Sequence, residues 1–433
     1  MKKFLTAILV LSLFFITGCD VPRFLGGGTP SGVSEGISTA SRPVSTSGPT
    51  VSSQFAAGEL AAVITSVYSP APAVTEQGLK PKPPEISAKS AVLINADTGT
   101  VIFEKNSLER RAMASTTKIL TTLLTLEAGE LDRSFTADSY AIRVEGSSMG
   151  LRQGDIVTRR ALCYGMMLPS GNDAAQAAAI SVSGSMSEFV MLMNARAEKI
   201  GMKDSHFANP SGLDAYGHYS TAYDMALLTM EALGNELFAE ICSSSSANVE
   251  FGNPPFKRWL YNNNRLLYMY EGAIGTKTGF TDDAGRCLVS AARRNGITLI
   301  AVTLNDPNDW KDHINMFNYG FSVVKNQPVE YDISRLCVNV AGCKNDTAYV
   351  RTAETPTLPL TDSEMRLVET KAIIRPFIYA GFSDGEPVGQ LMFYYNGKLL
   401  KTVPLVTAGT CECGSVRLNP AETFIQFCRR NLF

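Results

Sequence analysis

The 433-residue sequence predicts an α+β protein, in which an antiparallel sheet with a cluster of helices is followed by a small all-β domain. Two observations support this prediction. Strand-like runs near residues 91–105 and 287–304 enclose a region whose periodicity is mostly helical. After about residue 325 the pattern becomes one of short strands. Strands at both ends of a helical region indicate one sheet assembled from distant segments, with helices packed beside it.

The first residues have the pattern of an export signal. Met1-Lys2-Lys3 is followed by the apolar run Phe4–Ile16, which is too short to span a membrane comfortably. Ile16-Thr17-Gly18-Cys19 resembles the bacterial lipobox. We therefore expect residues 1–19 to be a lipoprotein signal peptide, with Cys19 lipidated and anchoring an extracytoplasmic protein to the membrane. The alternative is an ordinary cleaved signal with an incidental cysteine.

Residues 20–84 are rich in Ser, Thr, Gly and Pro, with one possible short ordered segment at Phe55–Tyr68. Such a composition buries too little apolar surface to offset the entropy of ordering. We predict a flexible tether that lets the folded part reach away from a membrane surface. About 350 residues remain, enough for two domains, which we place at 85–325 and 326–433.

Charge and cysteine content limit the partners. A net charge of −2 without a basic run argues against nucleic acid. Disulfides are compatible with an exported chain, but the sequence does not determine their pairing. We expect no metal or other cofactor, because no histidine lies among the five cysteines that follow residue 330. These are Cys337, Cys343, Cys411, Cys413 and Cys428.

Turn residues and apolar spacing define the individual elements. Asn295-Gly296 and Asn396-Gly397 each separate two strand-like runs and predict hairpins. The apolar positions after Ser115 recur at helical spacing and predict a helix that is buried on more than one side. The expected strands are Ala91–Ala96, Val101–Lys105, Cys287–Ala292, Ile297–Leu304, Leu391–Tyr395 and Lys398–Leu400, and two further expected helices include Ala174–Ile180 and Met191–Ile200.

Ser115-Thr116-Thr117-Lys118 is a candidate nucleophile with its base. Residues three apart share a helix face, so the amine of Lys118 can reach the hydroxyl of Ser115. Lysine accepts a proton when burial and a nearby cation lower its pKa, and we expect Lys277 to supply that charge. Ser115 at a helix start also provides a backbone N–H for developing negative charge. Alone, the motif could equally be a helix cap beside a solvated lysine.

Two further motifs follow in order along the chain. Ser170-Gly171-Asn172 precedes an alanine-rich helix, so it can act as a cap and also place Ser170 as a proton relay. Asn172 would hold Lys118 or a substrate amide. In Lys277-Thr278-Gly279, the lysine and threonine can bind a carboxylate, while the glycine lets a substrate backbone approach. Each motif is weak alone, and the ordered set carries the prediction.

With its flanking residues, this set resembles the serine-type D-alanyl-D-alanine carboxypeptidases, the low-molecular-mass penicillin-binding proteins. The resemblance covers about Ala88 to Phe321. The matching segments are Ala114–Lys118, Leu168–Ala175, Asn209–Asp214, His218–Ala222, Lys277–Thr281 and Asn318–Phe321.

The resemblance implies a β-lactamase/transpeptidase-like fold and an acyl-enzyme formed on Ser115. A peptidoglycan stem peptide ending in D-Ala-D-Ala would lose its terminal D-alanine. The oxyanion hole would consist of the N–H groups of Ser115 and Phe280, and β-lactams would acylate Ser115 as covalent inhibitors. Members often carry an arginine before the Asn-Tyr-Gly-Phe segment that helps hold the substrate carboxylate. Here Lys311 and Arg286 are the candidates, and the sequence does not choose between them.

Other functions are less consistent with the sequence. A class A β-lactamase would need a Glu-x-x-Leu-Asn motif, which is missing around Glu198–Leu213, so we expect slow deacylation of penicillin. A Ser-His-Asp hydrolase is disfavoured, because no Gly-x-Ser-x-Gly segment surrounds Ser115; His206 and His218 are expected to be structural hydrogen-bonding residues. A catalytically silent penicillin-binding sensor or cell-wall scaffold remains the alternative of another class.

Overall fold

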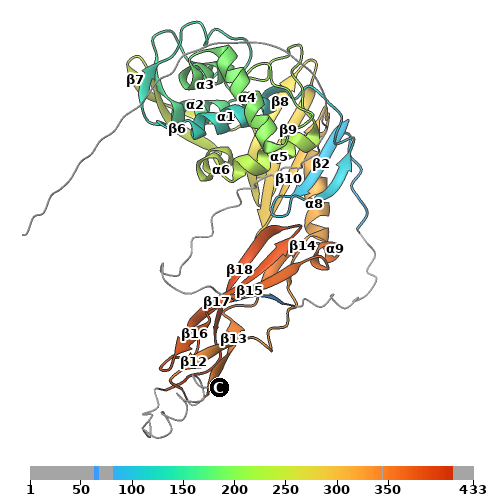
Figure 1. The fold of residues 1–433 in the computed structure, drawn as a ribbon. Helices are drawn as coiled ribbons and strands as arrows, with labels where there is room; N and C mark the ends of the chain where they lie inside the picture. The colour runs from blue at the N-terminus through green and yellow to red at the C-terminus, as the bar shows by residue number, and fades with distance from the viewer. Residues whose placement is uncertain (1–62, 68–80, 344, 413–433) are drawn as a thin grey trace, which may run out of the picture. The chain divides into compact units, whose positions relative to one another are not determined.

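A computed structural model describes residues 63–67, 81–343 and 345–412 (Figure 1). The predicted signal peptide with Cys19, most of the predicted tether, and Cys413 and Cys428 lie outside the described residues. Within the described part of the chain, no helix has the length and apolar character needed to cross a membrane.

A five-stranded antiparallel sheet forms the centre of the first domain, in the order β3-β2-β10-β9-β8. It joins the start of the domain to its end, as the sequence predicted. The hairpin between β9 and β10 turns at Asn295 and Gly296, both with positive φ, as a two-residue turn of this kind requires. The strands are β2 (Ser90–Asn95), β3 (Val101–Lys105), β8 (Ala273–Thr281), β9 (Gly285–Arg294) and β10 (Ile297–Leu304).

Helices cover both faces of this sheet (Figure 1), so β10 is buried along its whole length, and its sequence is apolar except for Thr298 and Thr303. Alternate residues separate the two faces. Leu93 and Leu299 pack with Phe317 of α8, whereas Ile94 and Ile300 belong to the larger core shared with the other helices. The helices are α1 (Lys118–Glu127), α2 (Arg159–Met167), α3 (Asn172–Ser183), α4 (Met186–Ile200), α5 (Ala222–Leu233), α6 (Glu236–Ser243), α7 (Leu266–Met269) and α8 (Asp309–Val323).

A smaller antiparallel sheet, in the order β4-β5-β6-β7, completes this domain. The sequence analysis did not predict its strands, which are short or carry mixed polar and apolar residues. They are β4 (Ser134–Thr136), β5 (Ile156–Thr158), β6 (Ser246–Gly252) and β7 (Pro255–Tyr261).

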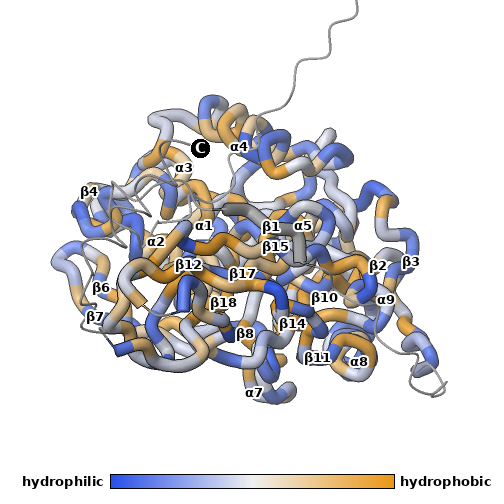
Figure 2. Tube along the Cα trace, turned by 60° about the horizontal axis from the view of Figure 1, so that its bottom comes forward, coloured by the Kyte–Doolittle hydropathy of each residue, from blue (hydrophilic) through white to orange (hydrophobic). Residues whose placement is uncertain are grey.

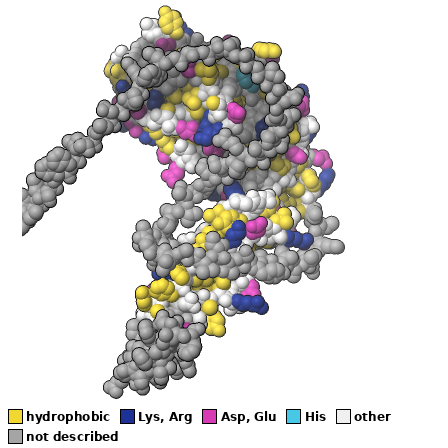
Figure 3. Space-filling view, viewed as in Figure 1, with side chains coloured by type: hydrophobic (Ala, Val, Ile, Leu, Met, Phe, Trp, Pro, Cys, Tyr) yellow, Lys and Arg dark blue, Asp and Glu magenta, His cyan; other side chains and the backbone are white. Residues whose placement is uncertain are grey.

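On the face shown in Figure 3, acidic and basic side chains are interspersed, in keeping with the net charge of −2.

The C-terminal part has its own apolar core around Leu391, Phe393 and Leu405, and the trace is hydrophobic along β17 (Figure 2). A seven-stranded sheet runs β1-β15-β17-β18-β13-β12-β16, and β11 pairs with β14. The predicted α+β class with a following β domain is confirmed. The remaining elements are β11 (Lys325–Pro328), β12 (Cys337–Ala341), β13 (Thr347–Thr352), β14 (Thr357–Leu360), α9 (Asp362–Met365), β15 (Glu369–Ile374), β16 (Phe377–Tyr379), β17 (Pro387–Tyr395) and β18 (Lys398–Thr407).

One segment of the predicted tether is a strand. β1 (Val63–Val67) pairs antiparallel with β15 at the edge of the seven-stranded sheet. β1 lies within the possible short ordered segment expected at Phe55–Tyr68, and three of its five residues are Val or Ile, which favour strands. The flexible tether over the rest of residues 20–84 stays a prediction. A disulfide joins Cys343 to Cys411 in the β domain, which supplies one pairing that the sequence left open.

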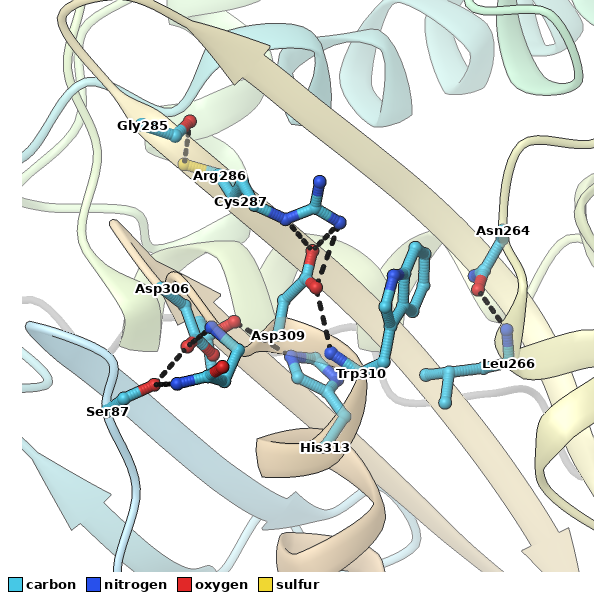
Figure 4. Close-up of polar contacts among 12 residues, drawn as sticks. Ser87, Asn264, Leu266, Gly285, Arg286, Cys287, Asp306, Asp309, Trp310 and His313 are labelled. Atoms are coloured by element: carbon cyan, nitrogen blue, oxygen red, sulfur yellow. Dashed lines mark hydrogen bonds and ion pairs between the residues drawn. The ribbon is translucent and has the colours of Figure 1, made fainter.

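Two buried carboxylates share one hydroxyl near the start of the first domain. Ser87 Oγ lies 2.9 Å from Asp306 Oδ1 (Figure 4) and 2.8 Å from Asp312 Oδ2. One hydroxyl proton can serve only one of these oxygens at a time. Burial, followed by repulsion from Asp312, raises the pKa of Asp306 to about 6.

We therefore predict a pH-dependent difference in stability between the wild type and Asp306→Asn. A raised pKa in the folded state stabilises the fold below the ordinary value of 3.8, and this contribution is lost as the pH rises through about 6. The neutral amide does not lose it. Urea unfolding between pH 3.5 and 7.5 should show the variant gaining free energy of unfolding relative to wild type up to about pH 6. A pH-independent difference between the two proteins would contradict this.

Candidate active site

Ser115 lies in a single 3-10 turn, Ala114–Thr117, which leads directly into α1 at Lys118. The spacing of three residues along this helical backbone brings Lys118 Nζ to 2.9 Å from Ser115 Oγ. Ala114, just before the nucleophile, has φ +48°, a conformation that costs an alanine roughly 1–2 kcal/mol. The contacts around this turn must hold it in place.

Lys118 is fully buried, and its amine is surrounded by three oxygen atoms. Besides Ser115 Oγ, these are Asn172 Oδ1 at 2.7 Å and the carbonyl of Ser211 at 2.6 Å. Burial lowers the pKa of Lys118 well below its usual range, and the positive charge of Lys277 lowers it further.

The number of donors and acceptors on a neutral lysine amine determines which of its contacts it donates to and which it accepts from. An uncharged lysine has two N–H groups and one lone pair. Asn172 Oδ1 and the Ser211 carbonyl can only accept, so they take the two N–H groups. The lone pair is left facing Ser115, whose hydroxyl then donates to it. This is the arrangement of a base poised to remove the serine proton.

Asn172 connects Lys118 to the segment before it. Its Nδ2 donates to the carbonyl of Glu145 at 2.6 Å, which leaves Oδ1 as the atom that faces the lysine. The neighbouring Asp173 accepts backbone N–H groups from Met149, Gly150 and Leu151 and so holds the same segment. Of the two partners expected for Asn172, the structure shows the contact with Lys118, and the contact with a substrate amide stays a prediction.

Ser170 occupies the turn between α2 and α3, with φ +67° and a side chain that is nearly buried. Its hydroxyl has no hydrogen bond to another described residue, and it stands two positions from Asn172. Lys118 thus contacts both Ser115 and Asn172 directly, whereas Ser170 is near them only by its place two residues before Asn172.

The lysine-threonine-glycine segment lies on β8, at the edge of the five-stranded sheet. Lys277 is buried, its Nζ donates to the carbonyl of Thr278 at 2.9 Å, and burial lowers its pKa to about 7. A Cβ at Gly279 would lie 3.1 Å from the backbone nitrogen of Ser115, so any side chain would crowd the nucleophile. Phe280 follows and is 63% exposed.

Arg286, on β9, is the cation beside this strand. It pairs in register with Phe280 and therefore shares a face of the sheet with Phe280 and Thr278. Its Nε and Nη2 contact the carboxylate of Asp309 in the first turn of α8, next to Trp310 (Figure 4). Lys311, the other candidate, is exposed on α8.

Two contributors to the site were missed by the sequence analysis, the carbonyls of Ser211 and Glu145. Backbone carbonyls have no residue signature, although Ser211 lies within the Asn209–Asp214 segment noted above. A group of acidic, histidine or cysteine side chains able to hold a metal ion is not found among the described residues.

The site combines a buried lysine amine in contact with a serine hydroxyl and a second buried lysine, Lys277, on the neighbouring strand β8. This combination is typical of a serine acyl-transfer enzyme. The family description of D-alanyl-D-alanine carboxypeptidase matches residues 77–308, and that of the C-terminal domain of penicillin-binding protein 5 matches residues 323–412. The chain belongs to the D-alanyl-D-alanine carboxypeptidase family. This confirms the predicted family and the predicted serine hydrolase with DD-carboxypeptidase activity; the silent sensor is not favoured.

Individual relatives agree with this assignment. D-alanyl-D-alanine carboxypeptidase DacF of Bacillus subtilis is 33% identical over 80% of this chain and 91% of its own length. DacC of Escherichia coli is 29% identical over 80% of this chain and 90% of its own. The crystal structure of the Streptomyces K15 DD-transpeptidase matches 56% of this chain and 100% of its own, with 34% identity and a TM-score of 0.54.

The two buried lysines generate a prediction about pH. In Lys277→Gln the charge that helps to lower the pKa of Lys118 is lost, so a larger fraction of Lys118 is protonated at low pH. The acidic limb of the rate of acylation by benzylpenicillin, followed from pH 4 to 8, should move to higher pH. An unchanged limb, with only a lower overall rate, would contradict this coupling. The exposed Lys311→Gln is the matched control.

Proposed function

We propose that Ser115 attacks the carbonyl carbon of the penultimate D-alanine in a peptidoglycan stem peptide ending in D-Ala-D-Ala. Lys118 takes the serine proton, the new ester bond forms on Ser115, and the bond to the terminal D-alanine breaks. Water then attacks the ester and releases the shortened peptide. The single observation behind this proposal is the 2.9 Å contact between the buried amine and the hydroxyl.

Ser170 is proposed to carry the proton to the departing amine. A leaving amine must gain a proton as the bond breaks, and the proton taken by Lys118 has to travel to it. Ser170 supports this role because its hydroxyl is free of other described partners while its turn adjoins Asn172, a direct contact of Lys118.

The N–H groups of Ser115 and Phe280 are proposed to stabilise the oxyanion. The close approach of Gly279 to the nitrogen of Ser115 supports this, because it places the backbone of β8 against the nucleophile. The edge position of β8 also leaves one side of the strand for the extended backbone of a peptide substrate.

Lys277, Thr278 and Arg286 are proposed to bind the terminal carboxylate of the substrate. Arg286 shares a face with Thr278, and Asp309 engages only its Nε and Nη2. The guanidinium has five N–H donors, so the Nη1 edge remains for a second carboxylate. On these contacts we choose Arg286 over the exposed Lys311.

Penicillins are proposed to acylate Ser115, since they imitate the substrate terminus, and to leave it slowly. The protein is further proposed to face the cell wall from the membrane through lipidated Cys19. The sequence of residues 1–19 alone supports the anchor.

Release of D-alanine tests the proposed nucleophile. The wild type incubated with a stem peptide ending in D-Ala-D-Ala should release D-alanine, and Ser115→Ala should lose at least about a thousandfold in rate, as nucleophile removal does in other serine hydrolases. Fluorescent penicillin labelling should disappear in the same variant. Release or labelling that persists in folded Ser115→Ala would assign the nucleophile elsewhere.

Substitution of Arg286 tests the carboxylate site. Removing a charge-assisted hydrogen bond costs about 1.5–3 kcal/mol, so Arg286→Gln should lower kcat/KM for the free-acid peptide about tenfold to a hundredfold. A peptide amidated at its C-terminus should react poorly with both proteins and show little difference between them. Lys311→Gln is the control, and equal losses in the two variants would argue for a general charge effect.

A further inference from the structure

His218 is buried one shell away from the nucleophile, with 7% of the residue exposed. Its Nδ1 accepts the backbone N–H of Ala208 at 3.0 Å, and its Nε2 lies 2.9 Å from Thr117 Oγ1. A backbone N–H can only donate, so Nδ1 must carry a lone pair. The proton of the neutral ring is therefore on Nε2 and is donated to Thr117.

Thr117 links His218 by hydrogen bonds to the turn that carries Ser115. With its oxygen accepting from His218, its hydroxyl proton is donated to the carbonyl of Ala114 at 2.9 Å. Ala114 is the residue with φ +48° directly before Ser115. The chain of donors from His218 through Thr117 thus ends on the peptide group whose orientation decides where Ser115 points.

The segment that ends at His218, residues 208–218, also holds the other side of this turn. We call it the positioning loop. Gly212, with φ +88°, packs so closely that a Cβ there would lie 2.0 Å from the Ala114 carbonyl oxygen. Ser211 and Pro210 accept from Lys118 and Thr121 through their carbonyls.

The positioning loop is itself fixed at several points. Asn209 Oδ1 accepts the N–H groups of Ser211 and Gly212, which shapes the turn between them. Asp214 accepts from Thr281 Oγ1 at 2.7 Å, at the end of β8. One loop therefore contacts the base, the nucleophile turn and the strand of the proposed oxyanion hole.

We propose that His218 and Thr117 are positioning residues, which hold the Ala114–Ser115 peptide so that the Ser115 hydroxyl faces the Lys118 amine. The inference deepens the proposed acylation step and rests on Ser115 as its nucleophile. Neither residue touches the reacting atoms. Their contribution is to keep a backbone conformation that alanine disfavours, in the geometry needed for attack.

The neutral ring that this chain requires is consistent with the surroundings of His218. Burial, followed by the nearby His206, lowers the pKa of His218 to about 4; Lys118 acts in the same direction and Asp214 opposes it. A protonated ring would direct a second N–H at the N–H of Ala208 and break the contact with the loop.

Two amide substitutions at His218 separate its two contacts. Asparagine places an oxygen near the former Nδ1 and can keep the bond from Ala208, but its side chain is too short to reach Thr117. Glutamine places an N–H near the former Nε2 and can keep the bond to Thr117. Thr117→Val removes the same link from the other end while preserving shape. Lys203→Gln is the control, because Lys203 is exposed in the segment that precedes the loop.

The measurement is the acylation rate constant with benzylpenicillin, with thermal unfolding of each full-length variant as the companion. His218→Asn and Thr117→Val should each slow acylation about tenfold to a hundredfold, as a small misplacement of a reacting group does. His218→Gln should recover most of the rate, and the double variant His218→Asn/Thr117→Val should be no slower than either single one. Lys203→Gln should match the wild type.

Several outcomes would overturn the inference. If His218→Gln were as slow as His218→Asn, the hydrogen bond from position 218 to Thr117 would not contribute to the acylation rate, and the ring would matter only through its packing. Additive losses in the double variant, or rates that follow only the unfolding temperature, would indicate separate structural effects. Failure of the proposed function gives a different result, because labelling would then persist in Ser115→Ala.

Discussion

The structure depends on keeping one lysine uncharged inside the protein. Lys118 is fully buried and forms no ion pair among the described residues, so its ammonium form would lack water and would have only the nearby charge of Asp173 in its favour. The two acceptors, Asn172 and the Ser211 carbonyl, satisfy a neutral amine and leave its lone pair for Ser115. A second buried cation, Lys277, makes the charged state still less favourable. The groups around Lys118 come from α1, α3, β8 and the loop of residues 208–218, so elements distant in the sequence together favour the neutral form of this lysine.

Such a site is expected to lower the free energy of unfolding of the domain. Packing elsewhere in the domain has to offset this cost. Two buried amines and two residues with positive φ, Ala114 and Ser170, each have a conformational or desolvation cost. The cost is offset by packing elsewhere, above all by β10, which is buried along its length between two helical layers. Active sites commonly combine strain and unfavourable charge in this way, because the catalytic geometry is not the most stable one.

Much of this arrangement could be predicted from the sequence, and the limits have physical reasons. The Asn-Gly turns, the helix after Ser115 and the three motifs are local patterns, and each corresponds to an element where it was expected. The carbonyls of Ser211 and Glu145 could not be predicted, because every residue has a carbonyl. A short ordered segment around β1 was expected, but its pairing with β15 is a matter of tertiary structure, as is the Cys343–Cys411 disulfide, so neither partner could be predicted from the sequence.

In the proposed mechanism, Lys118 acts as the base both when Ser115 is acylated and when water hydrolyses the acyl-enzyme. A class A β-lactamase has a glutamate that activates the deacylating water. Here, the described residues provide no carboxylate in contact with Ser115 or Lys118, and Asp173 is occupied by backbone N–H groups. In the proposed mechanism, the lone pair of Lys118 that accepts the serine proton therefore also accepts the proton of the deacylating water. A departing D-alanine leaves room for that water, whereas the opened ring of a penicillin stays attached to the acyl group. In the proposed mechanism, hydrolysis of the peptide ester and persistence of the penicillin ester would both follow from one base in one position.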